Sequence, residues 1–466
     1  MPVQAEDEED EEFEAAADDE DPGKVEGTGT HFEVTNSKYL NVILDSSETI
    51  TLELESVPEM IIMHIGPVSA SSTTITISGL APDTTYHTYE DSYENHVDYT
   101  TDSSGSYTYT QDLSVSHLVF IQPRESTKFL TDDATGGDCT SIGTWDDTNN
   151  ICTLNTDVTE TIEIQDDNIT LDCDGHTLDG TGTGSGVFLN GRMNVTVRNC
   201  TITDFSDGIN LDFSDSNEIE DNMVTNSDND GINLDDSNNN TIYHNTVTDS
   251  DDDGIRLDDS NDNDVTNNNI NNSGDDGIFC DDDCNNNTIE GNTIRNSDSD
   301  GIFFEDDVND NEILNNIIIN SGGDGIEFDD DEDDGNDDNQ IKGNCIINAN
   351  SDGIELDDRN ETNDIKNNTI INANDGIDIT DDENFDNDIE GNTVIGTSSG
   401  GIEIAGGSQD NEVFNNNFIN TGDPLDDDGD NEFDRPLPIG GNFWSQFNEP
   451  SEGCFNTSPA DRFCDD

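Results

Sequence analysis

Basic residues are almost missing from this chain of 466 residues. Lys and Arg together number 13, whereas Asp and Glu number 111, so the formal net charge is −98. A surface of this sign repels nucleic acid and anionic membranes, which excludes both as partners, and it favours cations, basic partners or neutral sugars. The imbalance is typical of proteins that work in molar salt, where the Debye length falls to about 3 Å and self-repulsion is screened.

Long apolar runs are also absent. No apolar stretch of about 18 residues occurs, so the sequence predicts no membrane span. The first residues, MPVQAEDEEDEEF, have neither a basic start nor an apolar segment, which does not fit a signal peptide. We interpret residues 1–30 as an acidic, disordered tail.

Soft metal ligands are scarce, with seven His and five Met, and no Cys or His cluster has the spacing of a zinc site. Instead, eight of the nine cysteines form pairs, which predict disulfides and an oxidising compartment; reduced buried thiols are the alternative. Cys345 has no obvious mate. The candidate pairs are Cys139 with Cys152, Cys173 with Cys200, Cys280 with Cys284, and Cys454 with Cys464.

The dominant feature of the chain is a repeat with a period near 23 residues. About ten copies of it fill residues 186–420. One copy reads DGINLDDSNNNTIYHNTVTDSDD, and its apolar positions are Ile232, Leu234, Ile242 and Val247. Apolar residues two apart point to one side of a strand, so each copy predicts short strands that stack in parallel at about 4.8 Å. The repeat therefore indicates an all-β solenoid.

Glycine and asparagine recur at fixed places in each copy. We expect the glycine to permit a tight corner, and the asparagine to adopt the left-handed conformation and to bond its neighbours above and below. The glycines are Gly208, Gly231, Gly254, Gly277, Gly301, Gly325, Gly353, Gly376 and Gly401, and the asparagines are Asn222, Asn245, Asn268, Asn292, Asn316, Asn344, Asn368, Asn392 and Asn416.

The regions that flank the repeats differ in character. Residues 31–122 contain short alternating runs between turn residues, which predict a small β-sandwich. Within it, residues 77–86 resemble the corner of fibronectin type III-like domains, where a tyrosine hydroxyl bonds back to the backbone. We interpret residues 123–185 as an N-terminal cap with the first coil, and residues 421–466 as a C-terminal cap.

Two rows of acidic residues follow the repeat, and stacking would place like charges about 4.8 Å apart. High salt, raised pKa values or bound cations must offset their repulsion, and oxygen ligands suit Ca²⁺ or Mg²⁺. The first row is Asp207, Asp230, Asp253, Asp276, Asp300, Asp324, Asp352 and Asp375, and the second is Asp212, Asp235, Asp258, Asp281, Glu305, Asp329 and Asp357.

Two loops sharpen the calcium hypothesis. DDDEDDGNDDNQI matches a calcium loop at five positions but has Ile341 in place of the final bidentate Glu, and DDDGDNEFD has alternating aspartates. Chance matches are frequent in a chain so rich in Asp. The candidate ligands are Asp330, Glu332, Asp334 and Asp338 in the first loop, and Asp426, Asp428, Asp430 and Asp434 in the second.

The motifs GI-x-L, N-x-I-x-x-N-x-I and NITLDCDGHTL resemble the right-handed parallel β-helix repeats of pectate-lyase-like proteins. They resemble more narrowly the carbohydrate-binding and sugar-hydrolase repeats that also occur in the accessory protein of nitrous oxide reductase maturation. GGNFWSQF resembles the motif that closes such archaeal and bacterial members, whose closing segment runs on further, so we expect a truncated end. The resemblance implies a β-helix of about ten to twelve coils but leaves the activity open.

Three functions are compatible with this resemblance. The leading one is a non-catalytic protein, secreted or on the cell surface, that binds carbohydrate and cations, with Phe279, Phe303 and Arg256 as the sugar-binding candidates. The alternative is a lyase or hydrolase of acidic polysaccharide that uses Asp275, Asp276 and Arg256, although a uniform repeat argues against one privileged acid pair. A copper-related maturation accessory protein, which needs soft ligands, is the third.

Overall fold

The computed structural model describes residues 23–34, 41–57, 60–82, 84–91, 96–123, 127–306, 308–329, 335–357, 359–380, 384–422, 426–427, 431–435 and 440–445. The chain divides into two compact units, residues 1–125 and 126–466. Among the residues described, no helix has the length and apolar character needed to cross a membrane.

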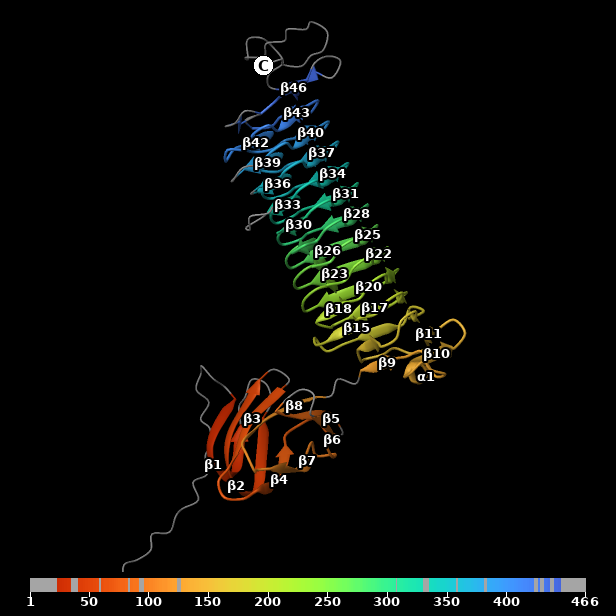
Figure 1. Cartoon of the computed structure of the whole chain (residues 1–466), viewed down its shortest axis with the longest axis vertical. Helices are drawn as coiled ribbons and strands as arrows, with labels where there is room; N and C mark the ends of the chain where they lie inside the picture. Colours follow the sequence, from red (N-terminus) through yellow and green to blue (C-terminus); the bar gives the residue numbers. More distant parts are fainter. Residues whose placement is uncertain are drawn as a thin grey trace, which may run out of the picture. The chain divides into compact units, whose positions relative to one another are not determined.

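The first unit is a small all-β domain (Figure 1). Its described strands pair into one antiparallel sheet in the order β6-β5-β8-β3-β2-β4-β7, with β1 paired to β2. They are β1 (Lys24–Val34), β2 (Val42–Val57), β3 (Met60–Pro67), β4 (Ser72–Ser78), β5 (Thr85–Glu90), β6 (His96–Thr100), β7 (Tyr107–Asp112) and β8 (His117–Pro123).

The predicted small β domain is confirmed, but its strands form one hydrogen-bonded sheet instead of the two sheets of a sandwich. The reason is the long strand β2, which pairs with β4 through residues 43–46 and with β3 through residues 50–57, so that it joins both halves. The hydroxyl of Tyr86 accepts a hydrogen bond of 3.0 Å from the backbone N–H of Ala81. This is the bond that the resemblance of residues 77–86 implied.

The second unit is a solenoid whose three sheets rise together along the stack and are parallel apart from their first hairpin (Figure 1). Sheet I contains β9 (Lys128–Leu130), β12 (Ile162–Ile164), β15 (Ser185–Asn190), β18 (Asp207–Asp212), β21 (Ile232–Asp235), β24 (Ile255–Asp258), β27 (Ile278–Asp281), β30 (Ile302–Glu305), β33 (Ile326–Asp329), β36 (Ile354–Asp357), β39 (Ile377–Thr380), β42 (Ile402–Ile404) and β45 (Asp426–Asp427).

Sheet II contains β10 (Gly143–Asp146), β11 (Ile151–Leu154), β13 (Thr170–Asp172), β16 (Thr196–Arg198), β19 (Glu218–Glu220), β22 (Thr241–Tyr243), β25 (Asp264–Thr266), β28 (Thr288–Glu290), β31 (Glu312–Leu314), β34 (Gln340–Lys342), β37 (Asp364–Lys366), β40 (Asp388–Glu390) and β43 (Glu412–Phe414). Sheet III contains β14 (Thr177–Asp179), β17 (Thr201–Thr203), β20 (Met223–Ser227), β23 (Thr246–Ser250), β26 (Asn269–Ser273), β29 (Thr293–Arg295), β32 (Ile317–Ile319), β35 (Cys345–Ile347), β38 (Thr369–Ile371), β41 (Thr393–Ile395), β44 (Asn417–Ile419) and β48 (Phe443–Trp444).

The apolar positions of the repeat form the core, as predicted. Ile232 and Leu234 lie on sheet I, Ile242 on sheet II and Val247 on sheet III, and all four are buried. Each pairs in register with its equivalent one coil away, so like residues stack on like. This register confirms the geometric premise on which the acidic rows depend.

Irregular elements lie at both ends of the solenoid. In the predicted N-terminal cap, α1 (Cys139–Ile142) precedes the antiparallel hairpin of β10 and β11. Near the other end, β46 (Asp434–Arg435) pairs with β47 (Gly440–Gly441). Residues 446–466, which include the motif's Phe447, lie outside the described residues.

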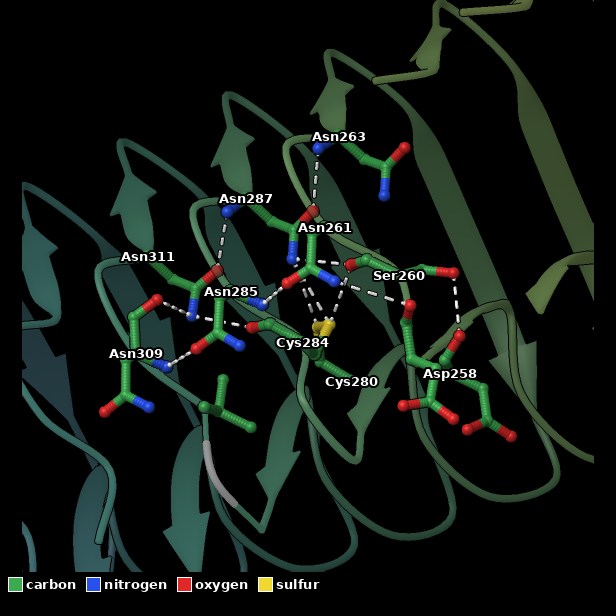
Figure 2. Close-up of a disulfide and its surroundings, with 12 residues drawn as sticks. Asp258, Ser260, Asn261, Asn263, Cys280, Cys284, Asn285, Asn287, Asn309 and Asn311 are labelled. Carbon is green, nitrogen blue, oxygen red and sulfur yellow. Dashed lines mark hydrogen bonds between the residues drawn. A yellow bond between two sulfur atoms is a disulfide. The ribbon is translucent and has the colours of Figure 1, made fainter. Parts of the chain in front are cut away.

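Buried asparagines hold successive coils together. The Oδ1 atom of Asn268 accepts the backbone N–H of Asn245 at 2.9 Å, and its Nδ2 donates to the carbonyl of Ile242 at 2.8 Å. A second ladder of the same kind, which we did not anticipate, lies between sheets I and II (Figure 2). Its members are Asn217, Asn240, Asn263, Asn287, Asn311, Asn339, Asn363, Asn387 and Asn411.

Two expectations about these turns were wrong. The left-handed conformation belongs to the residue before each predicted asparagine, as at His244 (φ 56°) and Asn267 (φ 55°), because the ladder asparagine itself must turn its amide toward the neighbouring coils. The recurring glycines serve close packing instead of a corner. A Cβ on Gly277 would lie 2.3 Å from Cγ2 of Ile294 and 2.5 Å from the carbonyl oxygen of Gly301.

Three predicted disulfides are confirmed. The Cα atoms are 5.7 Å apart in Cys139–Cys152, 4.8 Å in Cys173–Cys200 and 5.9 Å in Cys280–Cys284, the last of which lies beside the second ladder (Figure 2). Cys345 is a free, half-buried thiol. The fourth predicted pair, Cys454 and Cys464, lies outside the described residues.

We predict that Asn268→Ala destabilises the solenoid strongly. It leaves the buried N–H of Asn245 and carbonyl of Ile242 without partners, at about 1–3 kcal/mol each, so the free energy of unfolding should fall by about 2–6 kcal/mol. Urea unfolding followed by circular dichroism measures the loss. Thr266→Ala, at a half-buried outward position of sheet II, is the control, and equal stability of the two variants would contradict a structural role for the ladder.

Candidate functional site

The outward face of sheet I carries the side chains that the sequence singled out. We call its middle outward positions the central row. The acidic row that precedes the strands is the inner acid row, and the one that ends them is the outer acid row. In register, the central row reads Asn210, Asn233, Arg256, Phe279, Phe303, Glu327, Glu355, Asp378 and Glu403.

The predicted sugar-binding residues meet in the middle of this row. The rings of Phe279 and Phe303 stack with centroids 5.2 Å apart and planes 11° apart. The guanidinium of Arg256 lies 4.7 Å above Phe279, and its Nη2 binds Asp281 at 2.5 Å and Asp258 at 3.1 Å. Phe279 is therefore only 8% exposed, so Phe303, which is half-buried, offers the accessible ring.

The inner acid row is buried and bonded to backbone. Asp230 Oδ1 accepts the N–H of Asp253 at 3.0 Å, Asp253 that of Asp276 at 2.9 Å, and Asp276 that of Asp300 at 2.7 Å. The same bond continues through Asp324, Asp352 and Asp375. From Asp230 to Asp352, each carboxylate thus satisfies the backbone amide of the row member in the next coil, while its equivalents lie directly above and below.

Burial raises the pKa of these carboxyl groups. Loss of hydration is the main cause, and the charge of neighbouring row members adds to it. The pKa is raised to about 6 at Asp230, about 7 at Asp253 and about 8 at Asp276. The pKa of Asp207 and Asp352 is also raised by burial.

Three residues that sequence reasoning missed extend this acidic system into the central row. Burial raises the pKa of Glu327 and Glu355, and it raises the pKa of Asp378 to about 8. In each of three groups, every residue offers one carboxylate oxygen, and these lie within 4.8 Å of one another. The groups are Asp300–Asp324–Glu327, Asp324–Asp352–Glu355 and Asp352–Asp375–Asp378, so consecutive triads share a residue.

A signal for these three residues exists in the sequence. The central position of GI-x-L changes from Asn, Arg and Phe to GIEF, GIEL and GIDI in consecutive coils. The two acidic rows predicted from the sequence do not include this position.

The remaining metal candidates lie elsewhere. The outer acid row is half-buried along its whole length. Of the two calcium-like loops, Asp338 is exposed, and Asp330, Glu332 and Asp334 lie outside the described residues. Asp428 and Asp430 also lie outside them, and Asp426 and Asp434 are described only in their backbone, in β45 and β46.

The catalytic candidates are not brought together as a distinct pair. Asp276 is one rung of the inner acid row, whereas Asp275 beside it is exposed.

His244 lies in the turn between sheets II and III, where it lines a groove of about 460 Å³ with Asp221 and Met223. Its Nδ1 is 4.0 Å from Asp221 Oδ1.

The first unit holds a further cluster that sequence reasoning missed. Nδ1 of the buried His117 lies 2.7 Å from Asp91 Oδ2 and 3.7 Å from Glu90 Oε1. The three residues come together because β5 pairs with β8.

The inner acid row predicts an unusual dependence of stability on pH. The pKa values of Asp230, Asp253 and Asp276 are about 6, 7 and 8 in the folded chain against about 3.9 when unfolded, so the folded state holds the protons more tightly. Stability should therefore fall as pH rises from about 4 to about 8 and then level off. Calorimetric melting temperatures across this range in dilute buffer measure the slope.

Asp276→Asn removes one titrating rung and should flatten this slope. Asp251→Asn makes the same charge change at an exposed site and is the control. A melting temperature that rises with pH over this window in the wild-type chain would contradict the burial of the row.

Comparison with known proteins gives two family matches. The model of the right-handed beta helix region matches residues 185–334, and that of the periplasmic copper-binding protein (NosD) matches residues 272–449. No curated protein sequence matches the chain.

Similar solved structures include the catalytic unit of the thermostable GH87 alpha-1,3-glucanase from Streptomyces thermodiastaticus, with 13% identity, a TM-score of 0.49, and coverage of 92% of this chain and 99% of that chain. The A-module of the mannuronan C-5 epimerase AlgE6 from Azotobacter vinelandii has 14% identity, a TM-score of 0.43, and coverage of 61% and 90%. The stacked register of the coils agrees with the two family matches, so the second unit of this chain consists of right-handed parallel β-helix repeats.

Proposed function

We propose that this chain is a non-catalytic β-helix protein that binds divalent cations and carbohydrate on the outward face of sheet I. The observation that carries the proposal is the composition of the central row, where a stacked aromatic pair beside an arginine is followed by four acidic residues in consecutive coils. The two ligand classes would then bind side by side on one continuous surface.

The cation part rests on the three triads. Each triad concentrates carboxylate oxygens within 4.8 Å, and carboxylates with raised pKa values lack the charge compensation that a cation would supply. All ligands are oxygens, which suits Ca²⁺ or Mg²⁺ and disfavours softer metals. Because consecutive triads share Asp324 and Asp352, the cations would bind in a row along the stack.

The carbohydrate part rests on Phe303 and its surroundings. A half-buried ring backed by a second ring gives a firm apolar platform for the face of a sugar. The flanking carboxylates of the outer acid row can accept hydrogen bonds from sugar hydroxyls. Arg256, whose charge is partly neutralised by Asp258 and Asp281, would hold an acidic substituent less firmly than a free arginine.

A polysaccharide lyase or hydrolase is the alternative. Catalysis needs acid and base groups whose environments differ, placed on either side of one bond. The inner acid row repeats one environment in coil after coil, so no single rung is set apart. The non-catalytic reading therefore fits the described residues better.

Copper handling is supported by the family match over residues 272–449, which is named for a periplasmic copper-binding protein. That segment contains no His and no Met, and its free thiol is Cys345. Copper sites draw on these soft ligands, so we rank this function third. The name of the matched family and the three disulfides support an oxidising location, secreted or at the cell surface.

We predict that Ca²⁺ raises the melting temperature in dilute buffer, with a much smaller gain in molar NaCl. A site that is filled a hundredfold above its dissociation constant adds about 2.7 kcal/mol of stability. The double variant Glu327→Gln/Glu355→Gln should lose most of the gain, whereas Glu290→Gln, on the exposed side of sheet II, should keep it. Equal gains in both variants would assign the effect to diffuse screening.

We predict binding without cleavage on polysaccharide arrays that include neutral glucans and uronic-acid polymers. Phe303→Ala should weaken binding by roughly tenfold, because it removes the accessible ring of the platform. Phe213→Ala, a 59% exposed phenylalanine, is the control. Release of reducing ends or unsaturated products by the wild-type chain would show instead that it is an enzyme.

A further inference from the structure

One side of the solenoid carries no charge over five consecutive coils. In a chain in which 27% of residues are Asp, Glu, Lys or Arg, none of these types occurs in the segments that contain β32, β35, β38, β41 and β44 and the turns beside them. The segments are residues 315–323, 343–351, 367–374, 391–400 and 415–422. We call this surface the neutral face.

An isoleucine ladder runs along the neutral face. Ile319, Ile347, Ile371, Ile395 and Ile419 pair in register at the outward end of their strands, and all five are half-buried. Ile317 beside the ladder is 41% exposed. An apolar row on an otherwise acidic surface is the usual mark of an interaction site.

The ladder is not a requirement of the coil itself. In the preceding coils the same position of sheet III holds polar residues, namely Thr203, Thr225, Thr248, Asn271 and Arg295. The inward positions of those coils are as apolar as elsewhere, for example Val247 and Ile270. The core of a coil is therefore complete with a polar residue at this outward position, and it does not require the isoleucine.

We propose that the neutral face docks on the neutral face of a second copy of this chain. The net negative charge of the chain favours a second copy as the partner of this face. Two copies that each carry a net charge of −98 repel one another across every acidic surface, and this face is where they can approach without burying like charges. An oppositely charged partner would bind the acidic rows of sheet I instead.

The spacing of the rungs favours the same partner. Rows of isoleucine side chains on two copies have the same separation of about 4.8 Å, so the ridges of one fit the furrows of the other over the whole ladder. A two-fold axis through Ile371, the middle rung, places Ile319 opposite Ile419 and Ile347 opposite Ile395. All five rungs are then buried in an antiparallel pair.

The antiparallel direction also limits repulsion. The neutral face lies near the C-terminal end of the described coils, so in this arrangement the acidic coils before Ile319 extend past the described coils of the partner. A parallel pair would instead align the acidic coils of both copies along their full length. Because repulsion grows with the charge brought alongside, the antiparallel pair is favoured.

The size of the face sets the strength of the contact. Five coils span about 24 Å, and the strand with its two turns spans about 17 Å, which gives about 400 Å² per copy. A stable interface buries about 800 Å² per partner, so the pair is weak and reversible. Salt should strengthen it, because screening reduces the repulsion between the copies while leaving apolar contacts in place.

Sedimentation velocity over a wide range of protein concentration, in dilute and in molar NaCl, tests the proposal. The wild-type chain should form dimers, with tighter association in molar salt. Ile371→Thr/Ile395→Thr inserts the residue type of the earlier coils and should weaken the dimer by on the order of tenfold or more. Ile371→Asp should abolish it, whereas Thr248→Asp, with the same charge at the same position of an earlier coil, should leave it unchanged.

Cross-linking with a short bis-maleimide tests the arrangement. In a Cys345→Ser background, Ile371→Cys should cross-link to itself across the axis, while Thr248→Cys should not, with the linked peptides identified by mass spectrometry. Circular dichroism confirms that each variant is folded.

A chain that stays monomeric at all concentrations and salts would overturn the proposal, as would dimers that survive Ile371→Asp. Efficient linking through Thr248→Cys would indicate parallel copies and overturn the antiparallel pair. A monomer that floats with neutral phosphatidylcholine vesicles, and loses this in Ile371→Asp, would assign the face to lipid instead.

Discussion

The solenoid depends on one constraint, which is that every side chain lies next to its own equivalent in the coils above and below. A residue type is therefore stable at a given position only if it tolerates its own kind as a neighbour. Isoleucine satisfies this by apolar contact. Asparagine satisfies it better, because its amide has both a donor and an acceptor, so that Asn268 accepts from Asn245 in one adjacent coil and donates to Asn292 in the other.

Aspartate meets the same constraint at a cost, since an ionised carboxylate can only accept. The inner acid row uses the available donor, the backbone N–H of the next coil, and the rest of the repulsion remains. Loss of hydration is the main cause of the raised pKa values in this row, and the remaining repulsion adds to it. The asparagine ladders and the aspartate row thus differ in chemistry more than in geometry. Only the aspartate row favours the binding of a proton or a cation.

The sequence was sufficient for most of the fold because the constraint acts on local pattern. The period, the apolar positions such as Ile232 and Leu234, and the three confirmed disulfides follow from spacing alone. It was insufficient where a residue serves packing in another coil. Gly277 faces the carbonyl of Gly301 in the next coil and Ile294 on sheet III of its own coil, contacts which no local pattern reports.

The candidate site was predictable only in part for a related reason. Outward positions do not affect the core, so their residues vary freely from coil to coil. A pattern that is common to all copies of the repeat therefore does not reveal them. Glu327 and Glu355 were missed on this ground, whereas Phe279 and Phe303 were found because two aromatics in register are rare. The pairing of strand β2 with β3 and β4 in the first unit was not predictable either. The sequence has no signal for which half of a long strand pairs with which neighbour.

The freedom of outward positions explains how one repeat can present different surfaces. Sheet I concentrates acidic groups, and the C-terminal coils of sheet III carry none, yet both rest on the same asparagine ladders. The acidic rows in turn couple protons to any cation that binds them, because a carboxyl group with a pKa of about 8 must release its proton to become a ligand. Cation affinity on this face should accordingly rise with pH over the range in which the unliganded solenoid loses stability. Bound cations would then restore, at neutral pH, the stability that ionisation of the carboxyl groups removes.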